Sequence, residues 1–157
     1  MAEAQEIVSS TSQDMQHAEV RFMRVQLDPG AYMPDRVHVP DAGADLRTPE
    51  RFILRAHSHV TIDTGVHIEI PYGYVGMVKS KSGLMLEGIV TDGTVDSGYT
   101  GSIRVVLFNH SGKHREFKAG DKIAQLVIMK IVSPTFVQVE KVEGGDRGDS
   151  GFGSTGR

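Results

Sequence analysis

The chain of 157 residues is 39% hydrophobic, which allows one core but leaves too little chain for two ordinary domains. Its 17 basic and 20 acidic side chains leave a formal charge of −3, which disfavours a protein held to nucleic acid by bulk charge. Cysteine is absent, which excludes disulfides, thiolate metal sites and cysteine nucleophiles and fits a cytoplasmic protein.

The N-terminal segment, Met1 to Glu19, is polar and acidic and lacks the apolar core of a signal peptide. We expect residues 1–19 to be a flexible extension. The longest apolar stretch, Ile123 to Val132, is interrupted by Gln125 and Lys130 and is shorter than the roughly 20 residues of a membrane helix. The sequence therefore predicts a soluble protein with no membrane partner.

Alternating apolar residues predict strands. Between Val66 and Ile70, apolar side chains alternate with His67 and Glu69, so one face would meet a core and the other water. Similar patterns bounded by turn residues predict strands at Val20–Gln26, Arg51–Ile62, Tyr74–Lys79, Ile103–Leu107, Ala124–Lys130 and Thr135–Val142. Many short strands with frequent turns indicate an all-β sandwich or barrel.

One short helical turn is expected within this β pattern. The hydroxyl of Ser82 is predicted to cap the segment Gly83–Glu87, and Gly88 is predicted to end it. A turn of this length is too short to pack as an independent helix.

Glycine crowds the C-terminal tail from Gly144 to Gly156, which carries one aromatic residue, Phe152. Such a tail buries too little surface to offset its ordering entropy, and a disordered terminus is its ordinary interpretation. The alternative is a ligand lid. Arg147 offers a bidentate cation, Ser154 and Thr155 offer hydroxyls, and glycine amides can approach a polyphosphate closely.

Five segments resemble, in the right order, the five motifs of the trimeric dUTPase family. They are Asp41–Leu46, Ser80–Leu84, Gly93–Gly101, Gly120–Leu126 and Arg147–Gly156. Each motif alone is weak, because short turns of this kind occur by chance. Their common order and spacing make the set specific, and the resemblance runs from about Val20 to Arg157.

The resemblance implies a distorted β-barrel or jelly-roll subunit over residues 20–143. It also implies a homotrimer with shared active sites, in which an arm of residues 144–157 closes over a neighbour's site. The implied reaction is hydrolysis of dUTP to dUMP and pyrophosphate, which limits uracil incorporation into DNA and supplies dUMP for thymidylate synthesis. Mg²⁺ is the implied cofactor, which Asp45 would hold through water, with no protein-only metal cage.

The resemblance assigns catalysis and phosphate binding to three motifs. Asp96 would activate water for attack on the α-phosphorus, although outside this motif it would be interpreted as a turn residue. Gln125 lies on an apolar strand, where its amide needs a partner, and would contact phosphate or the attacking water. Ser82 and Gly83 would offer amides to the phosphates. Lys81 replaces the arginine usual in this motif, which exchanges a bidentate fork for a point charge.

Base and sugar recognition is assigned to the third motif and the arm. Tyr99 would lay its ring against the deoxyribose and penalise a ribose 2′-hydroxyl. Backbone groups of a hairpin around Gly93, Thr94 and Val95 would contact the uracil edge and exclude the thymine methyl. In the arm, the resemblance assigns the uracil face to Phe152, the terminal phosphates to Arg147, and the γ-phosphate to Gly153, Ser154 and Thr155.

Two other functions remain open at this stage. A dCTP deaminase on a related fold would need an acid/base group, usually glutamate, whereas the third motif carries the aspartate and tyrosine of the hydrolase. A non-catalytic trimeric binder could contact a regulatory protein through residues 1–19 or Ser111–Lys118, neither of which contains a readable motif. His57 and His59 lie on one strand face but have no third ligand, so we expect surface residues rather than a zinc site.

Overall fold

The computed structural model describes residues 22–143, which form eleven strands and one helix. The strands are β1 (Val25–Leu27), β2 (Gly43–Arg47), β3 (Phe52–Leu54), β4 (Ser58–Asp63), β5 (Val66–Ile68), β6 (Tyr74–Lys79), β7 (Ile89–Val90), β8 (Asp92–Val95), β9 (Arg104–Asn109), β10 (Arg115–Phe117) and β11 (Lys122–Lys130). The helix is α2 (Ser82–Leu86). The prediction of an all-β chain with one short helical turn is confirmed.

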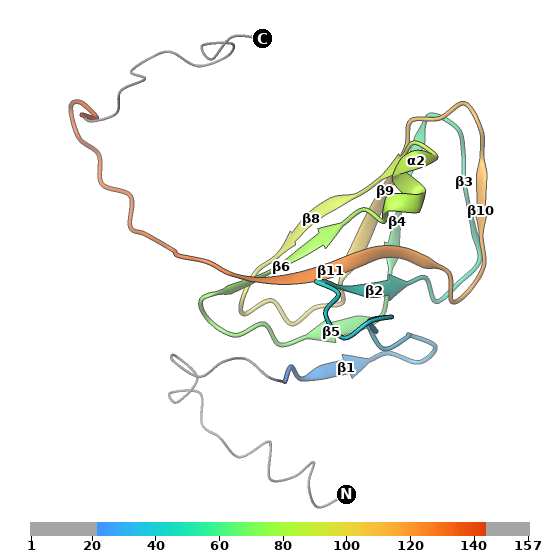
Figure 1. Cartoon of the computed structure of the whole chain (residues 1–157), viewed down its shortest axis with the longest axis horizontal. Helices are drawn as coiled ribbons and strands as arrows, with labels where there is room; N and C mark the ends of the chain where they lie inside the picture. Colours follow the sequence, from blue (N-terminus) through green and yellow to red (C-terminus); the bar gives the residue numbers. More distant parts are fainter. Residues whose placement is uncertain (1–21, 144–157) are drawn as a thin grey trace, which may run out of the picture.

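The largest sheet has four antiparallel strands in the order β2-β11-β6-β8 (Figure 1). Its longest strand, β11, pairs on both sides, so that Gln125 lies opposite Asp45 of β2 and Lys79 of β6. A second sheet has the order β4-β9-β7, and β1-β5 and β3-β10 form two-stranded sheets. Within residues 22–143 these sheets do not join into a closed ring, so the jelly-roll form of the prediction describes the architecture.

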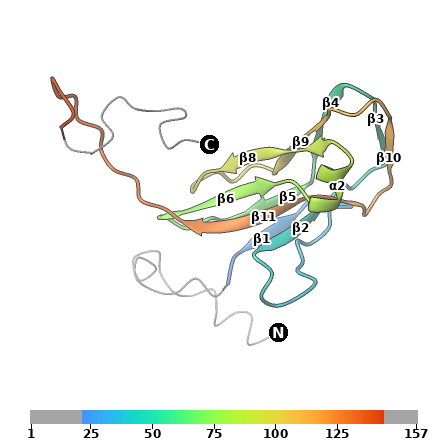
Figure 2. The ribbon, with the colours of Figure 1, turned by 45° about the horizontal axis from the view of Figure 1, so that its top comes forward.

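The core lies between the sheets because alternate residues of their strands point inward. Val105 and Leu107 of β9 and Leu126 of β11 are buried in one continuous cluster. Phe117 of β10 joins it and stacks on Phe52 of β3 with ring centroids 4.7 Å apart. Figure 2 shows β11 between β6 and β2, which places the residues of β11 at the centre of the sheet.

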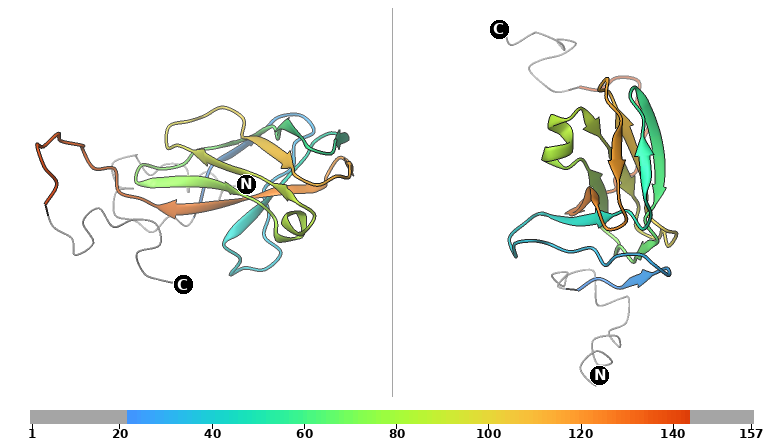
Figure 3. Two further views of the ribbon diagram at one scale, coloured as in Figure 1. Left: turned by 90° about the horizontal axis from the view of Figure 1, so that it is seen from above. Right: turned by 90° about the vertical axis from the view of Figure 1, so that its right-hand side faces the viewer.

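Three strand predictions need correction. The stretch Arg51–Ile62 forms two strands, β3 and β4, because His57 adopts a φ of 51° that interrupts the extended chain. The predicted strand Thr135–Val142 does not form. After Lys130 the chain leaves the body without joining a sheet (Figures 1 and 3). The predicted strand Val20–Gln26 is represented by β1 alone, and its first two residues lie outside the described range.

The helical turn forms where it is predicted, but with a different cap. Lys81 is the N-cap residue with extended backbone, and no side chain caps the helix. The predicted capping role of Ser82 is therefore wrong, because Ser82 is the first helical residue. Gly88 follows the helix with a φ of +78°, a conformation that favours glycine and ends a helix. No helix in the described range has the length and apolar character needed to cross a membrane.

Candidate active site

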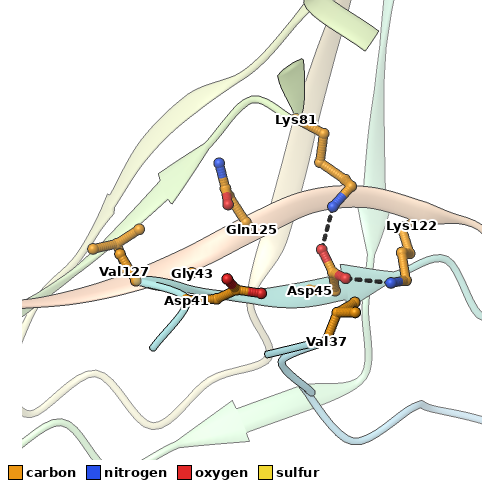
Figure 4. A pocket seen from close by; sticks show the side chains of 9 residues that line it. Val37, Asp41, Gly43, Asp45, Lys81, Lys122, Gln125 and Val127 are labelled. Carbon is orange, nitrogen blue, oxygen red and sulfur yellow. Dashed lines mark hydrogen bonds and ion pairs between the residues drawn. The ribbon is translucent and has the colours of Figure 1, made fainter. Parts of the chain in front are cut away.

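A pocket of about 300 Å³ opens beside β2 and β11 (Figure 4). Asp45 of β2 lies in it with its side chain only 7% exposed. One Asp45 carboxylate oxygen accepts a hydrogen bond from Lys81 Nζ, and the other lies 2.6 Å from Lys122 Nζ. The residues lining the pocket are Val37, Asp41, Ala42, Gly43, Asp45, Lys81, Lys122, Gln125 and Val127.

The two lysines determine the charge state of Asp45. Burial alone raises the pKa of the Asp45 carboxyl, but hydrogen bonds to Lys122 and Lys81 and their charges outweigh burial. The pKa of Asp45 therefore lies below its ordinary value. Asp45 is ionised at neutral pH, and the cluster of Lys81, Asp45 and Lys122 carries one excess positive charge. Each ammonium has three donors, so both lysines keep donors for an anion that enters the pocket.

Gln125 reaches the same pocket from β11. Its side-chain nitrogen donates to Ser80 O at 3.0 Å. The Ser80 hydroxyl donates to Thr91 O at 2.7 Å and accepts from Thr91 N at 2.8 Å, which connects β11 to the segment between β7 and β8. The side-chain oxygen of Gln125 lies against Gly43, where an added Cβ would come within 2.4 Å of it. Glycine at position 43 therefore makes room for the Gln125 amide.

Helix α2 places Ser82 and Gly83 directly after Lys81. Both residues are exposed, and backbone N–H groups in the first helical turn have no partner within the helix. No acidic side chain lies in this turn. Ser82 and Gly83 can therefore donate to a phosphate held near Lys81.

Asp96 and Tyr99 lie in the turn that follows β8, and both are exposed. The backbone N–H of Tyr99 donates to Asp96 O at 3.2 Å, and Gly98 adopts a φ of +85°. The Tyr99 hydroxyl donates to Ser102 O at 3.0 Å, and a Cβ added at Gly101 would lie 2.4 Å from that hydroxyl. The turn therefore holds the ring of Tyr99 in one place and leaves the Asp96 carboxylate open to a ligand.

Gly93, Thr94 and Val95 belong to β8, but the predicted hairpin with the next strand is wrong. β8 pairs with β6, whereas β9 pairs with β4 and β7 in the other sheet. The turn that carries Asp96 therefore crosses from one sheet to the other. Val95 is buried and Thr94 is exposed, so the polar groups of this segment are those of its backbone and of Thr94.

Within one chain, the predicted site residues fall into two groups. Asp45, Lys81 and Gln125 lie around the pocket, and Gln125 lies opposite Lys79 of β6. Val95 lies opposite Gly76 of β6, so Asp96 follows near the other end of that strand. A strand rises about 3.3 Å per residue, so Asp96 and Gln125 lie roughly 13 Å apart along the sheet, with β6 also between them. The two predicted catalytic residues do not meet within one chain.

The remaining predicted residues lie outside the described range; they are Arg147, Phe152, Gly153, Ser154 and Thr155. The structure also adds two residues that the sequence patterns did not single out, Lys122 and Ser80. Both residues lie inside the family motifs, Ser80 in Ser80–Leu84 and Lys122 in Gly120–Leu126, and this position was the only sequence feature that could have identified them. Their contacts depend on the pairing of β11 with β2 and β6, which a linear pattern does not show.

The carboxylates of the pocket suit a cation that keeps its bound waters better than a cation coordinated entirely by protein atoms. Within residues 22–143, no group of three or more His, Cys, Asp or Glu side chains could hold a metal ion. Asp45 and Asp41 both line the pocket, and Asp41 Oδ2 also accepts from the His38 amide at 3.0 Å. Mg²⁺ usually keeps several waters and takes one or two carboxylates plus substrate phosphates, so these residues fit Mg²⁺ bound through water.

Comparisons with known proteins identify the family of the chain. The family model described as dUTPase matches residues 31–156. The deoxyuridine 5'-triphosphate nucleotidohydrolase of Nocardia farcinica (strain IFM 10152) is 41% identical over 136 residues, which cover 83% of this chain and 82% of the relative. Its counterpart from Bifidobacterium longum (strain DJO10A) is 46% identical over 124 residues, with 76% and 78% covered.

Solved structures of dUTPases are also similar to this chain. A mutant dUTPase of Staphylococcus bacteriophage 80alpha with dUpNHpp superimposes with a TM-score of 0.82 at 30% identity, and 87% of this chain and 99% of that chain are covered. A mutant dUTPase of phage phi11 of S. aureus, described with a structural Mg(II) ion, gives a TM-score of 0.71 at 31% identity, with 76% and 97% covered. With sequence, fold and motif order in agreement, the chain belongs to the dUTPase family.

Proposed function

We propose that this chain hydrolyses dUTP to dUMP and pyrophosphate, which limits uracil incorporation into DNA and supplies dUMP for thymidylate synthesis. The observation that carries the proposal is the pair of lysines, Lys81 and Lys122, that flanks Asp45 in a pocket also lined by Gln125, in a chain of this family. Such a pocket suits the triphosphate chain, because lysine ammoniums bind phosphate oxygens as compact charges.

The reaction needs a water molecule, a base and groups that stabilise the charge on the phosphate oxygens. The exposed Asp96 carboxylate takes the proton from the water that attacks the α-phosphorus. Gln125 contacts the phosphate or the attacking water. The amides of Ser82 and Gly83, with Lys81, hold the phosphate chain, since they lie together at the start of α2.

Selectivity for the deoxynucleotide is assigned to the segment around β8. The exposed ring of Tyr99 packs against the deoxyribose and excludes a 2′-hydroxyl. The backbone of Gly93, Thr94 and Val95 contacts the uracil edge. The hydrogen bond from Tyr99 to Ser102 and the lack of a side chain at Gly101 support this role, because both hold the ring in one orientation.

Mg²⁺ is the proposed cofactor. Asp45 would hold it through water, next to Lys81 and Lys122, and Asp41 is the second carboxylate at the pocket. Bound there with the nucleotide, Mg²⁺ would neutralise negative charge on the phosphate oxygens. The lysines keep Asp45 ionised, which outer-shell binding of the cation requires.

We also propose a homotrimer in which each active site is shared between chains. The separation of Asp96 from Gln125 within one chain supports this arrangement. So does the segment after β11, whose apolar side chains are exposed in the isolated chain: Val132, Phe136, Val137, Val139 and Val142. Exposed apolar residues in such number favour packing against another copy.

Residues 144–157 are proposed as an arm that closes the site, and residues 1–19 as an extension outside the enzyme domain of residues 20–143. Deleting residues 144–157 is expected to lower kcat/KM for dUTP by at least about tenfold, because the arm's phosphate and uracil contacts are lost. The unfolding temperature and oligomer mass should stay unchanged. Deleting residues 1–19 is the matched control and should leave kinetics unchanged. Full activity in the arm deletion would exclude the lid.

A second prediction concerns Gly43. Gly43→Ala is expected to lower kcat for dUTP by about tenfold, because the new methyl would collide with the Gln125 side-chain oxygen and displace its amide from Ser80. Gly112→Ala is the control, since the nearest atom to an added Cβ there is 3.8 Å away. Unchanged kcat in Gly43→Ala would show that the position of Gln125 does not matter for turnover.

The proposed reaction is tested by offering the purified chain each common ribo- and deoxynucleoside triphosphate with Mg²⁺ and measuring pyrophosphate. We expect release from dUTP and little from dTTP, dCTP or UTP. Ammonia released from dCTP would instead identify a dCTP deaminase. A protein that binds dUTP without releasing pyrophosphate would be a binder rather than an enzyme.

A further inference from the structure

The turn that carries Asp96 and Tyr99 has fixed ends. Its first end continues β8, which is paired with β6. Its second end is held at Ile103, whose N–H donates to Val66 O at 2.8 Å and whose carbonyl accepts from Thr64 N at 3.1 Å. Ser102 adds a hydrogen bond from its hydroxyl to Asp63. The orientation of Asp96 and Tyr99 therefore depends on what holds the residues between these ends.

One side chain from outside the turn reaches its middle. Nδ1 of His67, on β5, lies 2.8 Å from Thr100 O. Within the described part of the chain, this is the one hydrogen bond that joins residues 97–101 to any residue outside the turn. The ring is anchored from the other side, because Nε2 lies 3.3 Å from Oδ2 of Asp28, which follows β1. The His67 side chain is 23% exposed, which limits its freedom to rotate away.

Both groups that face His67 are hydrogen-bond acceptors. A protonated imidazole donates to Thr100 O and to Asp28 at the same time, whereas a neutral ring donates to only one of them. Asp63 of β4 adds negative charge and is itself paired with Arg104 of β9. The backbone carbonyl of Thr100, then Asp28, raise the pKa of His67 above its ordinary value, and partial burial opposes them. Just after β5, the neighbouring charge is Glu69, which pairs with Arg24.

We infer that His67 is a positioning residue for the turn that carries Asp96 and Tyr99, and that its protonated form holds the turn in the conformation used for hydrolysis. The inference rests on the proposed roles of Asp96 and Tyr99. It assigns a function to His67 and Asp28, which lie in none of the five motifs. A structural role alone would stabilise the fold without linking turnover to the charge of His67.

The pH dependence has a defined direction. Because the folded-state pKa of His67 is raised, both hydrogen bonds are present below the ordinary histidine pKa, and one of them is lost as pH rises through the raised value. The neutral ring keeps at most one of its two hydrogen bonds, and its bare nitrogen then faces either Asp28 or Thr100 O. The contribution of His67 to turnover should therefore be largest in mildly acidic solution and smaller in alkaline solution, where at most one of the two hydrogen bonds remains.

The kinetic test divides the kcat of each full-length variant by the kcat of the unmodified chain at the same pH. This ratio cancels pH effects that all the proteins share. We expect kcat for dUTP of His67→Ala to be about fivefold below that of the unmodified chain near pH 6 and about twofold or less below it near pH 9, with KM changed less than kcat. His67→Gln should recover part of the loss with no dependence on pH, because an amide can donate to Thr100 O without titrating. His59→Ala removes an exposed histidine of β4 and should match the unmodified chain at every pH.

A second measurement does not depend on activity. In NMR spectra of the full chain, the backbone amides of Thr100 and Gly101 should titrate with the same pKa as the His67 ring, and Asp28→Asn should lower that pKa. The inference is overturned if these amides do not follow His67, or if the His67→Ala ratio is the same at all pH values. If these amides titrate with His67 but the chain releases no pyrophosphate from dUTP, the proposed function and the catalytic positioning role are both wrong. The contact of His67 with the turn would still stand.

Discussion

Asp96→Asn is expected to abolish turnover of dUTP while leaving its binding nearly unchanged. Asparagine has the same shape as aspartate but cannot accept a proton from the attacking water, so kcat should fall by about a thousandfold or more. Asp96 is exposed in the turn after β8, and its replacement should not disturb the core. Single-turnover kinetics with dUTP and Mg²⁺, with binding measured separately by calorimetry, separate the two effects.

A matched control lies on the adjoining strand. Asp92 is also exposed, at the start of β8, where it pairs with Lys79. Asp92→Asn should retain kcat within about twofold, because loss of an exposed ion pair has little effect on stability. If Asp96→Asn also kept kcat within about tenfold of the unmodified chain, another group would have to be the base.

The strands that could be predicted from the sequence are those whose alternation alone decides the structure. In β5, Val66 and Ile68 are buried and His67 between them is less buried, as the alternation predicts. Tyr74–Lys79 is a strand over the whole predicted stretch. β2 was not predicted, because the buried Asp45 breaks the apolar pattern and is stabilised only by Lys81 and Lys122. Thr135–Val142 has a strand pattern, but no neighbouring strand within the chain pairs with it. The hydropathy pattern of a segment does not show which other segment will pair with it.

In the candidate site too, local motifs identify some residues, whereas other contacts depend on how the strands pair. Motif order was enough to select Asp45, Lys81 and Gln125, and the structure places them at one pocket. The contact of Lys122 with Asp45 depends on the register between β11 and β2, where a shift occurs just after Lys122. His67 was recognised only as the polar partner in an alternating strand. Its contacts with Asp28 and Thr100 connect residues 39 and 33 positions away in the chain.

The separation of Asp96 from Gln125 leads to the second large expected effect. Two chains, one with Asp96→Asn and one with Gln125→Ala, are each expected to be nearly inactive alone. If the chain forms the proposed trimer and each site takes Asp96 from one chain and Gln125 from another, a mixed trimer must contain one site with both native residues. Mixed oligomers selected through two different affinity tags should therefore recover about a third of the activity of the unmodified trimer.

The matched control uses two residues of one pocket. Lys81 and Gln125 line the same pocket of the same chain, so mixing Lys81→Ala with Gln125→Ala chains leaves every site with one defect and should restore nothing. Recovery in the first mixture but not in the second requires that Asp96 and the pocket act across a chain boundary.

If neither mixture recovers while both form stable mixed oligomers, Asp96 and Gln125 must serve the same site from one chain. The turn after β8 would then have to move by roughly the 13 Å that separates them along the sheet. Such a displacement would break the contacts of Thr100 and Ser102 with His67 and Asp63, so the shared site is the arrangement that keeps this turn intact.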